Sequence, residues 1–224
     1  MAPTLAQRLA EATRILSDVS DTPRLDAELL LAHALGATRS ALLARLHEDR
    51  PAPEFESLVE RRKAHEPVAH ILGEWEFFSL PVYTQRPVLV PRPETEHLVE
   101  AVLAFIADRP ARFLDLCTGT GCVAVAIAVS APASCGVATD SNPAATALAR
   151  RNVERHGLES RVQVYEGDLF DALTPEEAEF DAICANPPYV ADAEWDTLAP
   201  DIRLHEDPRA LKAGPDGLDA IRRI

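Results

Sequence analysis

The segment Asn186-Pro187-Pro188-Tyr189 carries residue types that can hold a planar nitrogen group. Two consecutive prolines keep the backbone extended and have no N–H, so the local carbonyl oxygens stay available as hydrogen-bond acceptors. The side-chain oxygen of Asn186 and a carbonyl such as that of Pro187 can accept both hydrogens of an NH₂ group, while Tyr189 offers a ring to stack on it. The segment therefore predicts chemistry on an amide or amine nitrogen. A proline-rich loop that ends a strand is the structural alternative.

A glycine-rich turn is predicted at Asp115 to Gly121. Gly119 and Gly121 permit a tight turn and a close approach of the backbone to a ligand. The residues from Gly119 to Ala124 also fit the dinucleotide pattern G-x-G-x-x-A, and Asp140 follows at the distance expected of a ribose-binding acid. These features predict a nucleoside ligand and leave open whether it is a nicotinamide dinucleotide or S-adenosylmethionine.

Two further carboxylates bear on the identity of that ligand. Asp115 would repel a pyrophosphate, whereas it can accept hydrogen bonds from the ammonium group of S-adenosylmethionine. Asp168 can accept a hydrogen bond from the exocyclic amine of adenine, and Leu169 can pack on the ring. The structural alternatives are a capping carboxylate at Asp115 and an ordinary turn at Asp168.

All of these residues follow predicted parallel strands. Strands that alternate with helices are typical of a parallel sheet, whose ligands bind beyond the carboxyl ends of the strands. We therefore expect a Rossmann-like α/β fold in which the motifs share one crevice. The predicted strands are Arg112 to Leu116, Cys135 to Thr139, Arg161 to Tyr165 and Phe180 to Ala185, and the predicted helices between them are Val123 to Val129 and Pro143 to His156.

The preceding part of the chain has a different pattern. Helical periodicity predicts a small helical domain over residues 1–70, in which Thr22-Pro23 begins one helix, Gly36 follows its end and a later helix ends at Glu66. Alternating apolar residues over 71–92 predict a β-hairpin linker. The catalytic domain is expected at 93–224. Only four βα units are legible there, so we expect the natural protein to continue beyond Ile224, with a strand that covers the edge of the fourth.

Composition disfavours several classes of protein. A net charge of −14 over 224 residues opposes sequence-independent binding to phosphate backbones, so a nucleic-acid substrate is disfavoured. The four cysteines form no CxxC pair and have no histidine at metal-ligand spacing, which predicts reduced thiols of a cytoplasmic protein and no metal site. No run of about 18 apolar residues occurs, so no membrane-spanning segment is predicted.

Taken together, the motifs resemble those of the bacterial peptide chain release factor glutamine N5-methyltransferases, over essentially the whole chain. The residues that carry the resemblance are Pro91-Arg92-Pro93-Glu94-Thr95-Glu96, Asp115 to Gly121, Asp140 and Asn186-Pro187-Pro188-Tyr189, with Gly73 to Phe78 and Gly214-Pro215-Asp216-Gly217-Leu218. Cys117 departs from the glycine of many members. A sister family that acts on a ribosomal-protein glutamine shares Asn-Pro-Pro-Tyr and often this cysteine, but the Pro-Arg-Pro-Glu-Thr-Glu run favours the release-factor branch.

The resemblance implies a class I methyltransferase that uses S-adenosyl-L-methionine and releases S-adenosyl-L-homocysteine. Its substrate would be a protein, the glutamine of the Gly-Gly-Gln tripeptide of a release factor, with the N-terminal helical domain in substrate recognition. The implied catalytic residues are Asn186, Pro187 and Tyr189, which with Pro188 also bind the substrate. The implied cofactor-binding residues are Asp115, Cys117, Thr118, Gly119, Thr120, Gly121, Asp140, Asp168, Leu169 and Asn186. Arg92, Pro93, Glu94 and Thr95 are expected to form a wall of the pocket.

Three other functions remain as alternatives. A ribosomal-protein glutamine methyltransferase would share the same tetrapeptide. An adenine N6-methyltransferase would use it on a flipped base, but should carry a basic face that this acidic chain lacks. An NAD-dependent oxidoreductase would leave Asn186 to Tyr189 without a role. The favoured reaction is a single displacement by the amide nitrogen on the sulfonium methyl, and it assigns no histidine as a base.

Overall fold

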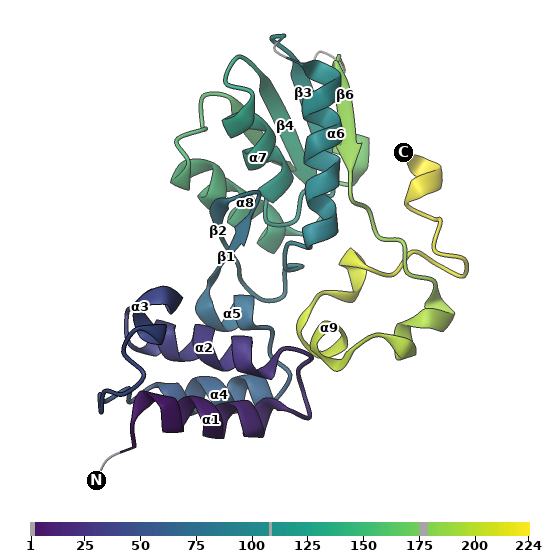
Figure 1. Cartoon of the computed structure of the whole chain (residues 1–224). Helices are drawn as coiled ribbons and strands as arrows, with labels where there is room; N and C mark the ends of the chain where they lie inside the picture. The colour runs from purple at the N-terminus through teal and green to yellow at the C-terminus, as the bar shows by residue number, and fades with distance from the viewer. Residues whose placement is uncertain (1–2, 108, 175–178) are drawn as a thin grey trace. The chain divides into compact units, whose positions relative to one another are not determined.

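A computed structural model describes residues 3–107, 109–174 and 179–224 of the chain. The chain divides into two compact units, one formed by Met1–Leu72 with Pro200–His205 and the other by Gly73–Ala199 with Glu206–Ile224. Figure 1 labels most of their helices and strands. No described helix has the length and the apolar character that crossing a membrane requires.

The first unit is helical. Its elements are α1 (Leu5–Leu16), α2 (Pro23–Ala34), α3 (Arg39–Leu43), α4 (Phe55–Lys63), α5 (Val68–Leu72) and α9 (Pro200–His205). As predicted, Pro23 is the first residue of α2 and Gly36 follows its end with a positive φ of 59°. The helix expected to end at Glu66 ends earlier, at Lys63 of α4. His65 has a left-handed φ of 64°, which an α-helix does not allow.

Buried charge pairs link the helices of this unit. Arg62 of α4 donates to Asp26 of α2 at 2.7 Å, with both side chains 9% exposed. Glu28 of α2 accepts from Arg24 and Arg39 at 2.6 and 2.7 Å, and these hydrogen bonds hold its pKa below the usual value although burial alone would raise it. Arg62 and Asp26 are both buried, so removing one of them would leave the other charge uncompensated, whereas Glu28 is buried but its two partners are half exposed.

The second unit contains a hairpin and a parallel sheet. The hairpin strands are β1 (Glu74–Phe77) and β2 (Leu80–Tyr83). The four-stranded sheet has the order β5-β4-β3-β6, formed by β3 (Arg112–Leu116), β4 (Cys135–Asp140), β5 (Val162–Glu166) and β6 (Ala182–Ala185). Its helices are α6 (Glu96–Ile106), α7 (Cys122–Ser130) and α8 (Pro143–Arg155), with short 3-10 turns that include η1 (Pro93–Thr95), η2 (Leu169–Ala172), η4 (Asp192–Thr197), η5 (Pro208–Ala210) and η6 (Ile221–Arg223).

The strand order creates a switch point at β3. After β5 the chain crosses to the other side of β3, so β3 pairs in parallel with β4 and with β6. Ligands of such sheets bind at the carboxyl ends beside this point. The predicted α/β class is therefore confirmed, although β6 begins at Ala182 and not at Phe180 as expected.

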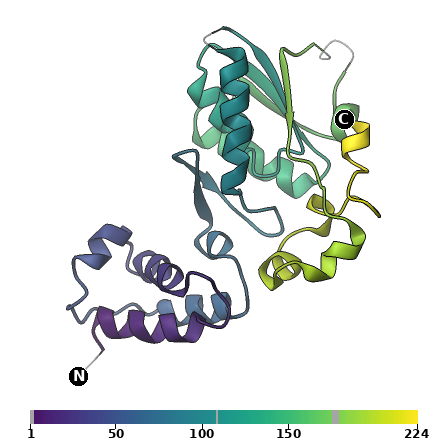
Figure 2. The ribbon, with the colours of Figure 1, turned by 45° about the vertical axis from the view of Figure 1, so that its right-hand side comes forward.

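One apolar core lies against the helix-covered face of the sheet. The α6 and α7 helices lie side by side in both views (Figure 1 and Figure 2). Residues 122–128 of α7 are all buried. A helix that is buried on all sides needs no polar face, and the sequence of α7 has none. Phe77 and Val82 of the hairpin belong to the same core, so the hairpin packs with the sheet unit.

Gly136 of β4 offers a test of this packing. A methyl group at Gly136 would overlap the ring of Phe113 on β3. Alanine in a strand is normally favoured over glycine by about 0.5–1 kcal/mol, whereas overpacking costs roughly 1–3 kcal/mol. We therefore expect Gly136→Ala to lower the free energy of unfolding, measured by urea denaturation. If the overlap is the cause, Gly136→Ala should cost less in a Phe113→Leu background. Equal costs in both backgrounds would contradict this account of the core.

Candidate active site

A pocket opens beyond the carboxyl ends of β3, β4 and β6, within the second unit. It is lined by residues of the glycine turn, of the segments around Arg92, Asp140 and Asp168, and of the tetrapeptide. The predicted site residues on its surface are Arg92, Thr95, Asp115, Cys117, Thr118, Gly119, Thr120, Asp140, Asp168, Leu169, Asn186 and Pro188. Residues widely separated in the chain thus meet at one edge of the sheet, as the parallel topology requires.

Asp115 is the most buried acid of this pocket. Its side chain, at the end of β3, is 1% exposed and accepts a hydrogen bond from Thr118 Oγ1 at 2.5 Å. Burial raises the pKa of Asp115 to about 7, and the nearby charge of Asp140 adds to the shift. A cationic group in the pocket would relieve this cost, because it favours the ionised carboxylate.

The turn after β3 winds through left-handed backbone. Cys117, Gly119 and Gly121 have φ values of 58°, 56° and 79°. A Cβ added at Gly119 would meet nothing within 4 Å, so this glycine leaves open space at the pocket surface. Gly121 lies elsewhere: an added Cβ would contact Ala149 Cβ at 3.0 Å, so this glycine permits α7 to approach α8 and does not line the pocket.

Cys117 is the non-glycine residue among these three left-handed positions. A non-glycine residue in left-handed conformation costs roughly 1–2 kcal/mol. Burial raises the pKa of the Cys117 thiol to about 12, with a further contribution from Asp140. The thiol is therefore protonated at neutral pH and unsuited to nucleophilic chemistry.

Asp140 ends β4 and is connected to the glycine turn. Its two carboxylate oxygens accept from Gly119 N and Asn142 N, each at 2.9 Å. Burial raises the pKa of Asp140 despite these hydrogen bonds. Each oxygen keeps a further lone pair, which suits the two hydroxyls of a ribose.

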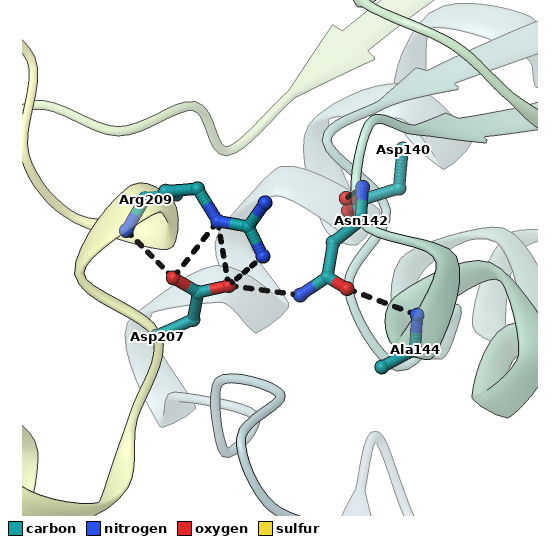
Figure 3. Close-up of polar contacts among 5 residues, drawn as sticks. All are labelled: Asp140, Asn142, Ala144, Asp207 and Arg209. Carbon is teal, nitrogen blue, oxygen red and sulfur yellow. Dashed lines mark hydrogen bonds and ion pairs between the residues drawn. The ribbon is translucent and has the colours of Figure 1, made fainter.

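A set of contacts between Asn142, Asp207 and Arg209, which the sequence did not reveal, lies beside Asp140 at the pocket (Figure 3). Asn142 caps α8 by accepting from Ala144 N at 2.9 Å, and its Nδ2 donates to Asp207 Oδ2 at 3.0 Å. Arg209 donates to both Asp207 oxygens, and these bonds hold the pKa of Asp207 below its usual value although burial alone would raise it. Asp207 and Arg209 line the pocket but carry no motif that periodicity or spacing would detect.

Glu206, the residue before Asp207, holds the segment that precedes α6. Glu206, whose side chain is 0% exposed, accepts from Arg92 Nη2 at 2.6 Å and from Val90 N at 3.2 Å. Of the predicted wall, Arg92 and Thr95 line the pocket and Glu94 lines a neighbouring one, whereas Pro93 is exposed and lines neither.

The tetrapeptide after β6 separates two pockets. Asn186 and Pro188 face the pocket described above, and Asn186, Pro187 and Tyr189 face a second pocket. This alternation is what an extended backbone produces. Tyr189 is 59% exposed, and Asn186 Nδ2 lies 3.4 Å from Thr95 Oγ1. Leu89, Leu98, Ala185 and Leu211 contribute apolar surface to the second pocket, which Arg92 and Glu94 also line.

The segment after β5 contributes Leu169 and a further acid, Asp168, to the pocket. Leu169 is 7% exposed, has a left-handed φ of 50° and lines the pocket. Asp168 pairs with Arg223 at 2.8 Å. Its carboxylate remains on the pocket surface, where it is available to a polar ligand edge.

The carboxylates that line this pocket fit S-adenosylmethionine. Asp115, Asp140 and Asp168 line it together. Its two lining arginines, Arg92 and Arg209, are paired with carboxylates. An acid-lined pocket favours a ligand with ammonium and sulfonium charges and opposes a pyrophosphate. The open space at Gly119 further permits a ligand to approach the backbone.

Comparison with known proteins agrees with this assignment. Residues 7–73 match the family model described as the PrmC N-terminal domain, and residues 95–215 match the methyltransferase small domain. A solved structure, the hMettl16 catalytic domain in complex with the MAT2A 3′UTR hairpin 6, shares the fold with a TM-score of 0.54 at 18% identity, covering 70% of this chain and 60% of that one.

Curated relatives extend over both matched regions. The release factor glutamine methyltransferase of Rhodopirellula baltica is 43% identical over 92% of this chain and 72% of the relative. The protein of the same name from Escherichia coli is 38% identical over 92% of this chain and 74% of the relative. The chain therefore belongs to the release factor glutamine methyltransferase family, whose cofactor is S-adenosylmethionine.

Proposed function

We propose that this protein transfers a methyl group from S-adenosylmethionine to the side-chain amide nitrogen, N5, of a glutamine in a release factor, within its Gly-Gly-Gln tripeptide. The observation that carries the proposal is the position of Asn186 on both pockets, the acid-lined one at the ends of the strands and the neighbouring one lined by Leu98 and Leu211. A single side chain thereby contacts both the cofactor site and the substrate site.

In the first pocket, the chain's own residues bind and orient the cofactor. Asp115 accepts from the amino-acid ammonium, Asp140 from the ribose hydroxyls and Asp168 from the adenine amine, with Leu169 against the ring. Gly119 leaves room for the ligand beside the backbone. The bound cofactor supplies an electrophilic methyl group on a sulfonium.

In the second pocket, the tetrapeptide holds the substrate amide. An amide nitrogen is a weak nucleophile because its lone pair is delocalised into the carbonyl. Asn186 Oδ1 and the Pro187 carbonyl accept its two N–H groups, which raises electron density on nitrogen and sets the line of attack. The apolar walls formed by Leu98 and Leu211 suit the methylenes of glutamine, and Tyr189 covers the amide plane. The extra proton of the product leaves to water.

The remaining parts of the chain have supporting roles in this proposal. The helical domain, residues 1–70, recognises the release factor, the hairpin at 71–92 connects it, and residues 93–224 carry the chemistry. A protein substrate suits the net charge of −14 better than a nucleic acid does. All four cysteines are free thiols, which suits a cytoplasmic location.

Mass spectrometry of a purified release factor, after incubation with this protein and S-adenosylmethionine, tests the proposal. We expect a gain of one methyl group that fragmentation places on the glutamine of Gly-Gly-Gln. Parallel incubations with ribosomal proteins and with adenine-containing DNA and RNA test the alternatives. Methylation confined to a ribosomal-protein glutamine, or to adenine, would replace the proposed substrate.

Substitution of Asn186 separates binding from chemistry. Asn186→Ala removes the acceptor that orients the amide, so we expect methyl transfer in single-turnover assays to fall by about 10²-fold or more. The affinity for S-adenosylhomocysteine, measured by calorimetry, should change far less than turnover, because Asn186 is one of many residues that line the cofactor pocket. Undiminished turnover would show that the tetrapeptide is structural.

The pKa of Asp115 predicts a pH dependence of cofactor binding. Its value of about 7 in the ligand-free protein means that the carboxylate is protonated at lower pH and then lacks the negative charge that attracts an ammonium. The affinity for S-adenosylhomocysteine should therefore fall as the pH decreases through 7, approaching about tenfold per pH unit well below it. Asp115→Asn should bind more weakly above this pH and lose the dependence. Calorimetry at several pH values measures both, and a pH-independent affinity of the unsubstituted protein would refute the role.

A further inference from the structure

Thr95 is the last residue of η1 and directly precedes α6, with helical φ and ψ of −70° and −16°. Its side chain forms no hydrogen bond that caps α6. Its Oγ1 instead lies 3.4 Å from Nδ2 of Asn186, which donates to it. The hydroxyl is thus directed to the residue that holds the substrate amide in the proposed function.

This contact selects one orientation of the Asn186 amide. The oxygen and the nitrogen of an asparagine side chain are similar in size, but one only accepts and the other only donates. With Nδ2 on Thr95, Oδ1 is the end left to face a ligand. Among the described residues, no hydrogen-bond donor is recorded on this oxygen. The reverse orientation would set N–H groups of Asn186 against N–H groups of the substrate.

The position of Thr95 is itself determined by buried contacts. Thr95 N donates to Arg92 O at 3.0 Å, and Arg92 pairs with the fully buried carboxylate of Glu206 at 2.6 Å. Thr95 lines both pockets, as Asn186 does. The hydroxyl is therefore held at the boundary where the methyl group would pass from cofactor to substrate.

We propose that Thr95 is a positioning residue for methyl transfer, whose hydroxyl accepts from Asn186 Nδ2 and keeps Asn186 Oδ1 directed at the substrate nitrogen. This inference rests on the proposed function, because the orientation matters only if Asn186 holds an NH₂ group. Thr95 acts through Asn186 and takes no part in bond making.

Substitution at Thr95 tests the inference. Thr95→Val removes the hydroxyl at constant shape, and Thr95→Ser keeps the hydroxyl. We expect Thr95→Val to lower kcat about 10-fold or more, since misorientation of a reacting group is costly. The affinity for S-adenosylhomocysteine should change far less than kcat, and Thr95→Ser should retain most of the activity. In an Asn186→Ala background, Thr95→Val should cause no additional loss. An active Thr95→Val, or losses that multiply in the double variant, would overturn the proposal.

A measurement without substrate separates this inference from the proposed function. The chain has three asparagines, so the side-chain NH₂ signal of Asn186 can be identified in NMR spectra by its loss in Asn186→Ala. Thr95→Val should shift this signal and speed its hydrogen exchange, and Thr95→Ser should not. An unchanged signal in Thr95→Val would overturn the positioning role. A protein that methylates no release factor but shows the shift would defeat the proposed substrate while the contact stands.

Discussion

Strand β3 is hydrogen-bonded in parallel to β4 on one side and to β6 on the other. In this register Asp115 lies opposite Ala138 of β4 and Cys184 of β6, so the turns that follow the three strands begin at the same edge. A shift of the register by one residue would turn Asp115 to the opposite face, because side chains alternate along a strand. The glycine turn, Asp140 and the tetrapeptide depend on this pairing for their proximity.

Polar side chains buried beside the sheet complete the arrangement. Asn152 of α8 is 0% exposed, donates to the carbonyls of Thr120 and Tyr83, and accepts from Tyr83 N at 2.7 Å. It thereby ties the glycine turn to the hairpin. Glu206 connects the segment before α6 in the same way. Buried polar groups are costly when unpaired, so these contacts favour one arrangement of the loops over others.

The acids that line the pocket differ in the direction in which their pKa values are shifted. Burial raises the pKa of Asp115 and of Asp140, whereas Asp207 has a lowered pKa because Arg209 is bonded to it. The first two acids therefore carry an electrostatic cost that a cationic ligand can offset. This gives a physical reason why a glycine-rich turn compatible with a dinucleotide accommodates S-adenosylmethionine in this family.

The sequence by itself determined the local features. Apolar runs and helical periodicity predicted a strand at Arg112 to Leu116, which is β3, and the alternation of strands with helices predicted the parallel sheet, because burial and backbone preference act over a few residues. The acids and the tetrapeptide were predicted to share one crevice from the rule that ligands bind at the carboxyl ends of parallel strands.

Only the tertiary structure decided which distant side chains meet. It placed Gly121 against Ala149 and not on the pocket, brought Asp207 to Asn142, and set Thr95 against Asn186, 91 residues away. Periodicity records which face of an element is buried, but it carries no information on the partner of a single polar side chain. Such pairings arise from packing of the whole unit, which fixes distances between residues far apart in the chain.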